Sequence, residues 1–216
     1  MPSSVQHKRI RKTPAARRAE IVGAAALTEG LECVTLRRIG EELGVRPGLI
    51  SHYFPSTDDL VAEAFGSAAD AELDSLLPAQ RAQGTPTLHL GWFFARATGA
   101  SYDNISRLWI NARHLSRYRP ALRDRVAEQE AAWRERLTGL IRQGVDRSEF
   151  RTDDPYVTTI QILVVLDGLG AHANTETGNR PAEVSRLAAT TAERELGLPH
   201  GTLTRSDAPL TASPTG

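Results

Sequence analysis

The chain has 216 residues, of which 40% are hydrophobic and 24% are charged, and its formal net charge is zero. This length allows one large domain or two small ones with a sizeable core. No apolar run approaches the roughly 18–20 residues that span a bilayer, and the first residues lack the apolar segment of a secretory signal. We therefore expect a cytoplasmic protein, with no disulfide framework because Cys33 is its only cysteine.

The charge is distributed unevenly along the chain. Residues 1–53 hold nine Lys/Arg and five Asp/Glu, a net charge of +4, whereas residues 54–216 hold seventeen and twenty-one, a net charge of −4. Six basic and no acidic side chains lie in the first 18 residues: Lys8, Arg9, Arg11, Lys12, Arg17 and Arg18. We expect residues 1–13 to be a disordered basic arm. Such an arm favours a polyanionic partner, although a solvated tail has the same composition.

Proline, glycine and capping residues divide the first part of the chain into four predicted helices. The first runs from Pro14 to about Glu29 and stops at Gly30. Thr35 caps the second, which ends at Gly44, and the third covers residues 47–53. Ser56 or Thr57 caps the fourth, which ends at Leu77 before a proline.

The second part of the chain predicts longer helices and no strand. The predicted helices are residues 88–99, 105–118, 121–144, 155–173 and 181–196. Residues 197–216 are rich in Pro, Thr, Ser and Gly and are expected to be a disordered tail. The expected fold is all-α, with a helix-turn-helix head within residues 14–60 and a helical regulatory and dimerisation domain over residues 61–196.

The strongest motif is VTLRRIGEELGVRPGLISHYFPSTDDL at residues 34–60. Two short helices joined by a turn at Gly44 form a helix-turn-helix pattern, centred on about residues 35–54. The apolar positions expected to fix the helix pair are Ile39, Leu43, Val45, Ile50 and Phe54. The exposed positions of the second helix are then Arg46, Pro47, Gly48, Leu49, Ser51, His52 and Tyr53. Such a helix fits the major groove of DNA; the alternative is a helical hairpin without a DNA role.

This motif resembles the tetracycline-repressor (TetR) family over about residues 14–65. The resemblance is carried by VTLRRIG at residues 34–40, LGV at residues 43–45, GLISHYFPS at residues 48–56 and DL at residues 59–60. The sequence ISHYF is most similar to the branch named after the betaine-synthesis repressor BetI. Residues 80–196 are similar to the family mainly in helix number, length and order. The resemblance implies a DNA-binding repressor.

The resemblance also implies which residues meet DNA. Thr35 matches a residue that holds a phosphate at a helix N-terminus, and Arg37 matches one that reaches a base or a phosphate. Thr57 stands where the family usually has a phosphate-binding lysine, so the basic arm and Arg46 are the candidates to replace that contact. The predicted DNA-binding set is Thr35, Arg37, Arg46, Pro47, Gly48, Leu49, Ser51, His52, Tyr53, Thr57, Lys8, Arg9, Arg11 and Lys12.

No catalytic, cofactor or metal site is predicted. The chain has no G-x-S-x-G nucleophile motif, and Gly168-x-Gly170 lies in an apolar run without the third glycine of a dinucleotide loop. His89, His114 and His172 have no His or Cys three or four residues away. The chain is therefore not expected to be an enzyme, and a helical enzyme remains only a remote alternative.

Three tryptophans fall on three successive predicted helices of the second domain. Large rings can pack a core, or they can hold helices apart around an apolar ligand pocket, and both interpretations stay open here. The predicted ligand-binding set is Trp92, Arg96, Trp109, Asn111, Arg113, His114, Tyr118, Trp133 and Gln161. An aromatic cage for a quaternary ammonium is conceivable, but an aromatic content of 6% does not lead us to predict choline.

The last two long helices predict a homodimer. Residues 160–166 are apolar almost all round, so a helix there must be covered on more than one side. The predicted interface residues are Leu163, Val164, Leu166, Asp167 and Leu187. A two-fold dimer matches a pseudo-palindromic operator with half-sites roughly 34–36 Å apart.

These observations favour a sequence-specific DNA-binding regulator in the cytoplasm, associated with the nucleoid. Its expected partners are double-stranded DNA, a second copy and a small-molecule effector that releases it from DNA. The alternative is a regulator whose body binds a protein partner or only dimerises. The identity of the effector, the operator sequence, the regulated genes, and repression as against activation are left open by the sequence.

Overall fold

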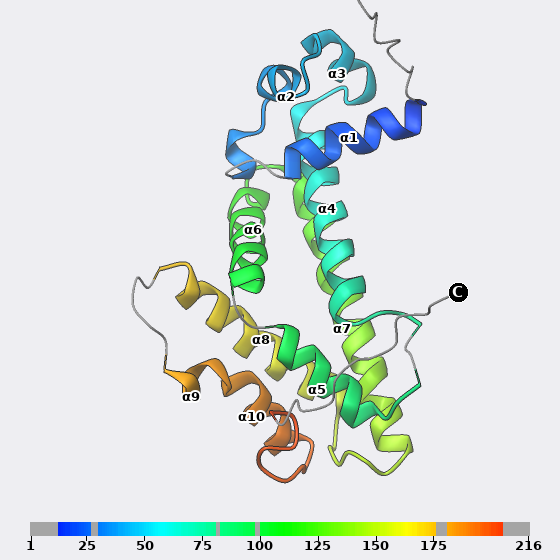
Figure 1. Cartoon of the computed structure of the whole chain (residues 1–216), viewed down its shortest axis with the longest axis vertical. Helices are drawn as coiled ribbons and strands as arrows, with labels where there is room; N and C mark the ends of the chain where they lie inside the picture. The colour runs from blue at the N-terminus through cyan, green and yellow to red at the C-terminus, as the bar shows by residue number, and fades with distance from the viewer. Residues whose placement is uncertain (1–12, 27–29, 81–82, 98–99, 176–180, 205–216) are drawn as a thin grey trace, which may run out of the picture.

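The computed structural model describes residues 13–26, 30–80, 83–97, 100–175 and 181–204. These residues form helices and connecting turns, with no strand among them, which confirms the predicted all-α class. The predicted basic arm, including Lys8, Arg9, Arg11 and Lys12, lies outside the described residues. Figure 1 shows a small group of helices at one end of an elongated molecule and a larger group at the other.

The small group, the head, consists of three α-helices and a 3-10 turn. Its elements are α1 (Pro14–Ala26), η1 (Leu31–Cys33), α2 (Leu36–Glu42) and α3 (Pro47–Tyr53). The predicted Thr35 cap and the predicted extent of α3 are confirmed. Ile39, Ile50 and Phe54 are fully buried, and Leu43 and Val45 are packed against the same core, as the pattern of apolar residues predicts. These residues are the head's part of one buried apolar cluster that continues into the rest of the molecule.

Helix α4 (Thr57–Leu76) connects the head to the larger group of helices, the body. It packs against α1 and against α7 (Pro120–Asp146), the longest helix of the described chain. Phe65 and Leu73 are buried along its length, and Ala62, Ala64 and Ala69 let neighbouring helices approach closely. One helix thus carries the buried apolar cluster from the head into the body.

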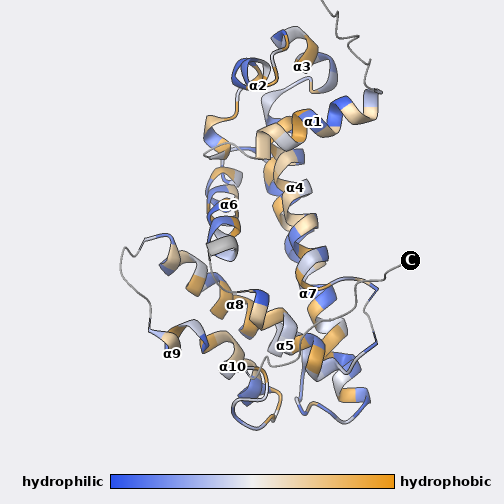
Figure 2. Cartoon of the chain, in the orientation of Figure 1, coloured by the Kyte–Doolittle hydropathy of each residue, from blue (hydrophilic) through white to orange (hydrophobic). Residues whose placement is uncertain are grey.

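The rest of the body surrounds α7. Its helices are α5 (Pro86–Arg96), α6 (Ala100–Ser116), α8 (Pro155–Ala173), α9 (Ala182–Ser185) and α10 (Leu187–Glu195). Helix α8 contacts α6, α7 and α10, and α8 and α10 lie beside each other at the far end from α3 (Figure 1). Figure 2 shows hydrophobic residues along much of α8.

Helix α8 is long and apolar enough to cross a bilayer by length and composition, with 33% of that segment buried. The expectation that no segment reaches this limit is therefore wrong. An apolar helix that is little buried in the monomer also occurs where a partner molecule covers its outer face.

Several predicted boundaries need correction. Helix α5 begins at Pro86 and α6 at Ala100, each ahead of the predicted start. Residues 181–196 do not form one helix, because the helix is interrupted at Arg186, between α9 and α10. The predicted disordered tail is also wrong in part: residues 197–204 fold back on the body, and Leu203 is only 2% exposed.

A buried glutamate fixes this C-terminal segment. The carboxylate of Glu193, on α10, is 2% exposed and accepts hydrogen bonds from the backbone N–H of Gly201 at 2.9 Å and of Leu203 at 2.7 Å. A charged acceptor with two N–H donors offsets the cost of burying it. Composition alone does not reveal such a tertiary contact.

We predict that Glu193→Ala lowers the free energy of unfolding by about 1–3 kcal/mol, because two N–H groups lose their acceptor. Urea denaturation followed by circular dichroism measures this change. Glu183→Ala is the control, since that side chain is 82% exposed on α9, and its effect should stay within about 0.5 kcal/mol. Equal stabilities of the two variants would contradict the role of Glu193.

Candidate DNA-binding surface and ligand cavity

Two glycines shape the turn between α2 and α3. Gly44 has a φ of +63°, a conformation that L-residues with side chains rarely adopt. A Cβ on Gly40 would lie 2.9 Å from the carbonyl oxygen of Val45, so only glycine fits this approach. The backbone N–H of Val45 donates to the carbonyl of Gly40 at 2.8 Å, which closes the turn. The angle between the two helices is therefore fixed locally.

Helix α3 presents the predicted groove-facing side to solvent. Arg46 precedes the helix and Pro47 occupies its first turn, where no N–H is needed. The exposed residues are Arg46, Pro47, Gly48, Ser51 and His52, while Leu49 and Tyr53 are partly buried. Helices α2 and α3 lie at the outer end of the head (Figure 1), where a duplex can approach them.

Arg37, on α2, is exposed but already has an anionic partner. Its Nε donates to Glu41 Oε1 at 2.8 Å, and the two side chains are 83% and 64% exposed. The hydrogen bond to Glu41, together with that carboxylate's charge, raises the pKa of Arg37. Any DNA contact by Arg37 must therefore replace Glu41, a competition that the sequence interpretation did not include.

Helices α2 and α4 are each capped at the N-terminus by the hydroxyl group of the residue that precedes the helix. Thr35 Oγ1 accepts from the N–H of Arg38 at 3.1 Å and is exposed. Ser56, and not Thr57, caps α4: its Oγ accepts from the N–H of Asp59 at 3.0 Å. Thr57 is the first residue of α4 and is half-buried.

Two of the six N-terminal basic residues have structural partners instead of belonging to an arm. Arg17 pairs with Glu20 within α1 at 2.6 Å. Arg18 forms two hydrogen bonds to Glu63 of α4, donates to the carbonyl of Tyr53 at 2.8 Å, and lies 4.2 Å from the ring centre of Phe54. Arg18 thus ties α1 to the end of α3 and to α4.

The body contains a cavity of about 170 Å³ that is lined by residues of α4, α5, α6, α7 and α8 and is partly open to solvent. Its lining residues are Glu72, Phe93, Tyr102, Ser106, Trp109, Ile110, Arg113, Glu130, Trp133, Arg134, Ile160, Leu163, Val164, Leu166 and Asp167. Trp109 packs edge-on against Phe65 with ring centres 5.0 Å apart, and Trp133 lies 6.3 Å from Phe93. The two tryptophans are therefore both core residues and cavity walls.

Only three of the nine residues predicted to bind a ligand line this cavity: Trp109, Arg113 and Trp133. Trp92 packs against His89 instead, Arg96 donates to Ser75, and Asn111 accepts from the backbone of Leu31. His114 and Tyr118 are exposed, and Gln161 lies in a separate shallow groove near Phe150. On α6, successive residues rotate by about 100°, so Trp109 and Arg113 share a face that Asn111 and His114 do not.

Of the residues predicted for the dimer interface, some are exposed in the monomer and others are buried. Leu166 is 4% exposed in the monomer and lines the cavity, so it is unavailable to a partner, and Leu163 is partly buried against the core. Val164 and Leu187 are 62% and 46% exposed. Asp167 lines the cavity with its side chain 50% exposed.

The carboxylates that line the cavity differ in whether they have a cationic partner. Arg113 donates to Glu130 at 3.0 Å and to Asp167 at 2.9 Å, and Arg134 lies 3.6 Å from Glu130. Glu72 accepts from Trp109 Nε1 at 2.7 Å and has no cationic partner within ion-pair distance among the described residues. Three carboxylates against two guanidinium groups leave one negative charge when Glu72 is ionised.

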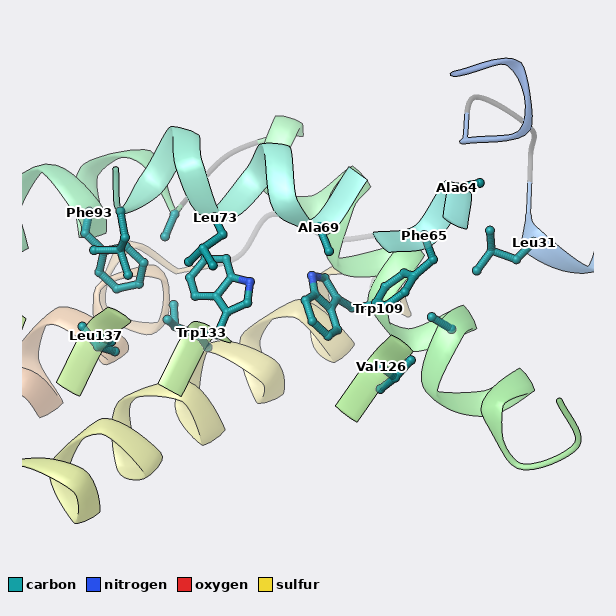
Figure 3. Packing of buried hydrophobic residues seen from close by; sticks show 14 of the residues in the cluster. Leu31, Ala64, Phe65, Ala69, Leu73, Phe93, Trp109, Val126, Trp133 and Leu137 are labelled. Carbon is teal, nitrogen blue, oxygen red and sulfur yellow. The ribbon is translucent and has the colours of Figure 1, made fainter. Parts of the chain in front are cut away.

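Burial dominates the ionisation of these groups. It raises the pKa of Glu72 to about 7, with the hydrogen bond from Trp109 opposing the rise. Burial also raises the pKa of Tyr102, helped by the charge of Glu72. Trp133 Nε1 is buried without a hydrogen-bond acceptor in the described structure. Figure 3 shows the nitrogen-bearing edges of Trp109 and Trp133 turned toward each other, with the small Ala69 beside them.

Helix α6 links the cavity to the head. Its residues Trp109 and Arg113 line the cavity, and Asn111, midway between them in sequence and on another face of the helix, accepts the N–H of Leu31 through Oδ1 at 2.7 Å. Leu31 begins η1, directly before α2. Sequence reasoning missed this role of Asn111, as well as the cavity residues Glu72, Tyr102 and Glu130, because each depends on how helices pack.

Two family models match the chain. Residues 22–64 match the model described as bacterial regulatory proteins of the tetR family. Residues 96–197 match the model described as the C-terminal part of a BetI-type transcriptional repressor. Together they cover the head and most of the body. No curated protein sequence matches the chain.

Solved structures share the fold at low sequence identity. A transcriptional regulator from Pseudomonas aeruginosa PAO1 is 22% identical with a TM-score of 0.72, covering 89% of this chain and 95% of its own. A TetR transcription regulator from Haloarcula marismortui is 23% identical with a TM-score of 0.70, covering 85% and 97%. A transcriptional regulator from Saccharomonospora viridis, solved in complex with choline, is 22% identical with a TM-score of 0.65, covering 83% and 95%.

The raised pKa of Glu72 predicts a specific pH dependence of stability. Between the ordinary value of 4.5 and about 7, the folded chain holds a proton on Glu72 that the unfolded chain has lost. This group's contribution to the free energy of unfolding therefore falls as pH rises through that range and then levels off. Glu72→Gln should remove this slope, as urea denaturation at several pH values would show. Parallel pH profiles for the parent and the variant would refute the assignment.

Proposed function

Since this chain belongs to the TetR family of bacterial regulatory proteins, we propose that it is a repressor that a small-molecule effector releases from its operator. The observation that carries the proposal is that one helix, α6, carries residues that line the cavity of the body and is also hydrogen-bonded to the head. Helix α3, with its exposed face at the other end of the head, supplies the DNA-reading surface.

A homodimer of this chain brings two α3 helices to one operator. Apolar side chains exposed on α8 and α10, Val157, Val164 and Leu187, are 50%, 62% and 46% exposed. An isologous contact between these helices covers them in both copies at once. Two heads then face two half-sites of a pseudo-palindrome roughly 34–36 Å apart.

The DNA contacts follow from the exposed head residues. Pro47, Gly48, Leu49 and Ser51 of α3 enter the major groove, while Thr35 and Tyr53 contact phosphates on either side. Thr57, at the start of α4, offers a hydroxyl without a charge. Arg37 exchanges its partner Glu41 for the DNA.

We predict that Arg37→Ala and Tyr53→Ala weaken operator binding without unfolding the head. For Arg37→Ala, losing a bidentate base contact costs about 1–3 kcal/mol, whereas losing a phosphate contact lowers the salt slope by less than about one, because Arg37 leaves Glu41 unpaired on binding. Tyr53→Ala removes an uncharged contact and should leave the salt slope unchanged. Fluorescence anisotropy with the DNA upstream of the chain's own coding region measures both at several salt concentrations. Arg142→Ala, an exposed change near the far end of α7, is the control and should bind like the parent. Parent-like affinity of both head variants would count against this surface.

Release of DNA follows from a shift of α6. A ligand that contacts Trp109 or Arg113 acts on the same rigid helix whose Asn111 holds the N–H of Leu31. A ligand shifts the population of head positions only through unequal affinity for the two states. The bond between Asn111 and Leu31 is the direct route by which that difference reaches α2.

The chemistry of the cavity favours a small organic monocation as effector. Glu72 provides a carboxylate without a cationic partner, and the rings of Trp109, Trp133, Tyr102 and Phe93 provide aromatic faces. Cations bind such faces, and more strongly where water is excluded. An acceptor atom on the ligand can also receive a hydrogen bond from Trp133 Nε1, which has no acceptor in the described structure. The Saccharomonospora regulator holds choline, a ligand of this charge, within the same fold.

We predict that choline and tetramethylammonium bind the parent, whereas 3,3-dimethylbutanol, the neutral analogue of choline, binds much more weakly. A cation binds the ionised form of Glu72, so its apparent affinity should rise with pH up to about 7 and then level off. The rise is about tenfold per pH unit where Glu72 is mostly protonated. Tryptophan fluorescence titrations measure the affinity. Glu72→Gln should abolish both the charge preference and the pH dependence; binding of the neutral analogue as tightly as choline would exclude the cationic effector.

A further inference from the structure

A second cavity, of about 160 Å³, lies where α8 meets α5 and α10. Its walls come from these three helices, from the interruption between α9 and α10, and from residues 203–204 (Figure 1). Among the described residues, neither a tryptophan nor any residue of the head lines it. This second cavity is therefore distinct from the cavity described above, the first cavity, and the proposed function does not use it.

The walls of the second cavity are mainly apolar and buried. Phe94, Leu166, Leu169, Ala188, Ala189 and Leu203 line it, and each is at most 8% exposed. Its polar lining residues are Ser185, Arg186 and Thr204, none of which is buried, so polar groups lie at its opening. A dry apolar cavity of about 150 Å³ is able to bind benzene, so this space suits a hydrocarbon group of about six carbon atoms.

Arg186 carries the only charge among the described residues that line the second cavity. Its Nε donates to the carbonyl of Ala182 at 3.2 Å, and its Nη2 lies 3.9 Å from Glu183 Oε1, which is beyond hydrogen-bonding distance. Glu183 is 82% exposed, so a carboxylate on a ligand can take its place beside the guanidinium. Apolar walls with one cation at the opening fit a ligand with a hydrocarbon chain and an anionic end.

The C-terminal segment forms one side of the second cavity. The backbone N–H of Leu203 donates to the buried carboxylate of Glu193 on α10 at 2.7 Å. The carbonyl oxygen of Leu203 would lie 3.9 Å from a Cβ on Gly91, so the segment also packs against α5. These contacts hold the side chain of Leu203 in the cavity wall, where its size limits the length of a bound chain.

We propose that the second cavity binds a short aliphatic carboxylate of about six carbon atoms, with hexanoate as the reference compound. Its chain lies between α5, α8 and α10, and its carboxylate pairs with Arg186. The first cavity does not suit this ligand, because three carboxylates against two guanidinium groups line it. The two cavities therefore select ligands of opposite charge.

Leu166 connects the two cavities, because its buried side chain lines both. Phe93 lines the first cavity and Phe94 the second, and their ring centres are 4.9 Å apart. A carboxylate that packs against Leu166 and Phe94 therefore acts on the walls of the effector site. This coupling rests on the proposed function, whereas the second site itself does not.

Isothermal titration calorimetry with the unbranched carboxylates from butanoate to decanoate tests the site. Affinity should rise about fourfold for each added methylene group until the chain fills the cavity, and then fall. Leu203→Ala removes part of the wall, so the optimum should move to chains about two carbon atoms longer. Leu198→Ala is the matched control in the same segment, because Leu198 packs against the core without lining the cavity, and its optimum should match the parent's. An optimum that Leu203→Ala does not move would overturn the assignment of the second cavity.

The neutral analogue hexan-1-ol tests the role of Arg186. The parent should bind hexanoate severalfold more tightly than hexan-1-ol, and Arg186→Gln should remove this preference while keeping the dependence on chain length. Arg194→Gln is the control, since that arginine of α10 is 75% exposed and does not line the cavity. Arg186 is 54% exposed, so its variant still tests the site if Leu203→Ala does not fold. Equal affinities of the parent for hexanoate and hexan-1-ol would refute the carboxylate ligand.

Choline titrations with and without saturating hexanoate measure the coupling. The affinity for choline should change, and saturating choline should change the affinity for hexanoate by the same factor. Two ligands that bind without affecting each other would overturn the coupling through Leu166. The chain-length series uses neither choline nor DNA, so the second site and the proposed function can fail independently.

Discussion

Helix α4 packs against α1 within the head and against α7 within the body, so a single helix makes the apolar cluster of the molecule continuous between its two ends. The guanidinium of Arg18 strengthens this arrangement, because it joins α1 to Glu63 of α4 and to the end of α3. Farther along, α4 contributes Glu72 to the cavity and Ala69 to the space beside its two indole rings (Figure 3). The position of the head, the shape of the cavity and its charge therefore all depend on one packed helix.

The two interpretations of the tryptophans turn out not to exclude each other. Trp109 and Trp133 are 9% and 8% exposed and pack against Phe65 and Phe93, as core residues do. Each ring also lines the cavity. Ring packing holds these walls rigid, so a ligand does not need to order them on binding, which lowers the entropic cost of recognition.

The parts of the fold that local chemistry determines could be predicted, whereas those that depend on helix packing could not. Gly44, Pro47 and the Thr35 cap act within a few residues, so the helix-turn-helix was predicted close to its observed bounds. Which side chains line the cavity depends on the rotation of each helix about its axis. Helix α6 mixes charged and apolar residues around its circumference, so the spacing of its apolar residues did not predict that rotation accurately. Glu72 lies on α4, where no ligand-binding residue was predicted, and its importance appears only when Trp109 of another helix donates a hydrogen bond to it at 2.7 Å. The order of residues 197–204 likewise depends on Glu193, which no local pattern connects to Leu203.

The pair of Arg37 and Glu41 has a thermodynamic consequence for the proposed complex. The counterions released on binding are cations condensed on the duplex. Arg37 displaces one of them when it reaches a phosphate, but it leaves Glu41 as an uncompensated anion beside the phosphates, and this anion attracts a cation in turn. The gain from Arg37 is therefore a difference between two similar electrostatic energies. The number of counterions released on binding should be smaller than the number of arginines that touch the DNA, so the head would read its site with a gentler dependence on ionic strength than its basic composition indicates.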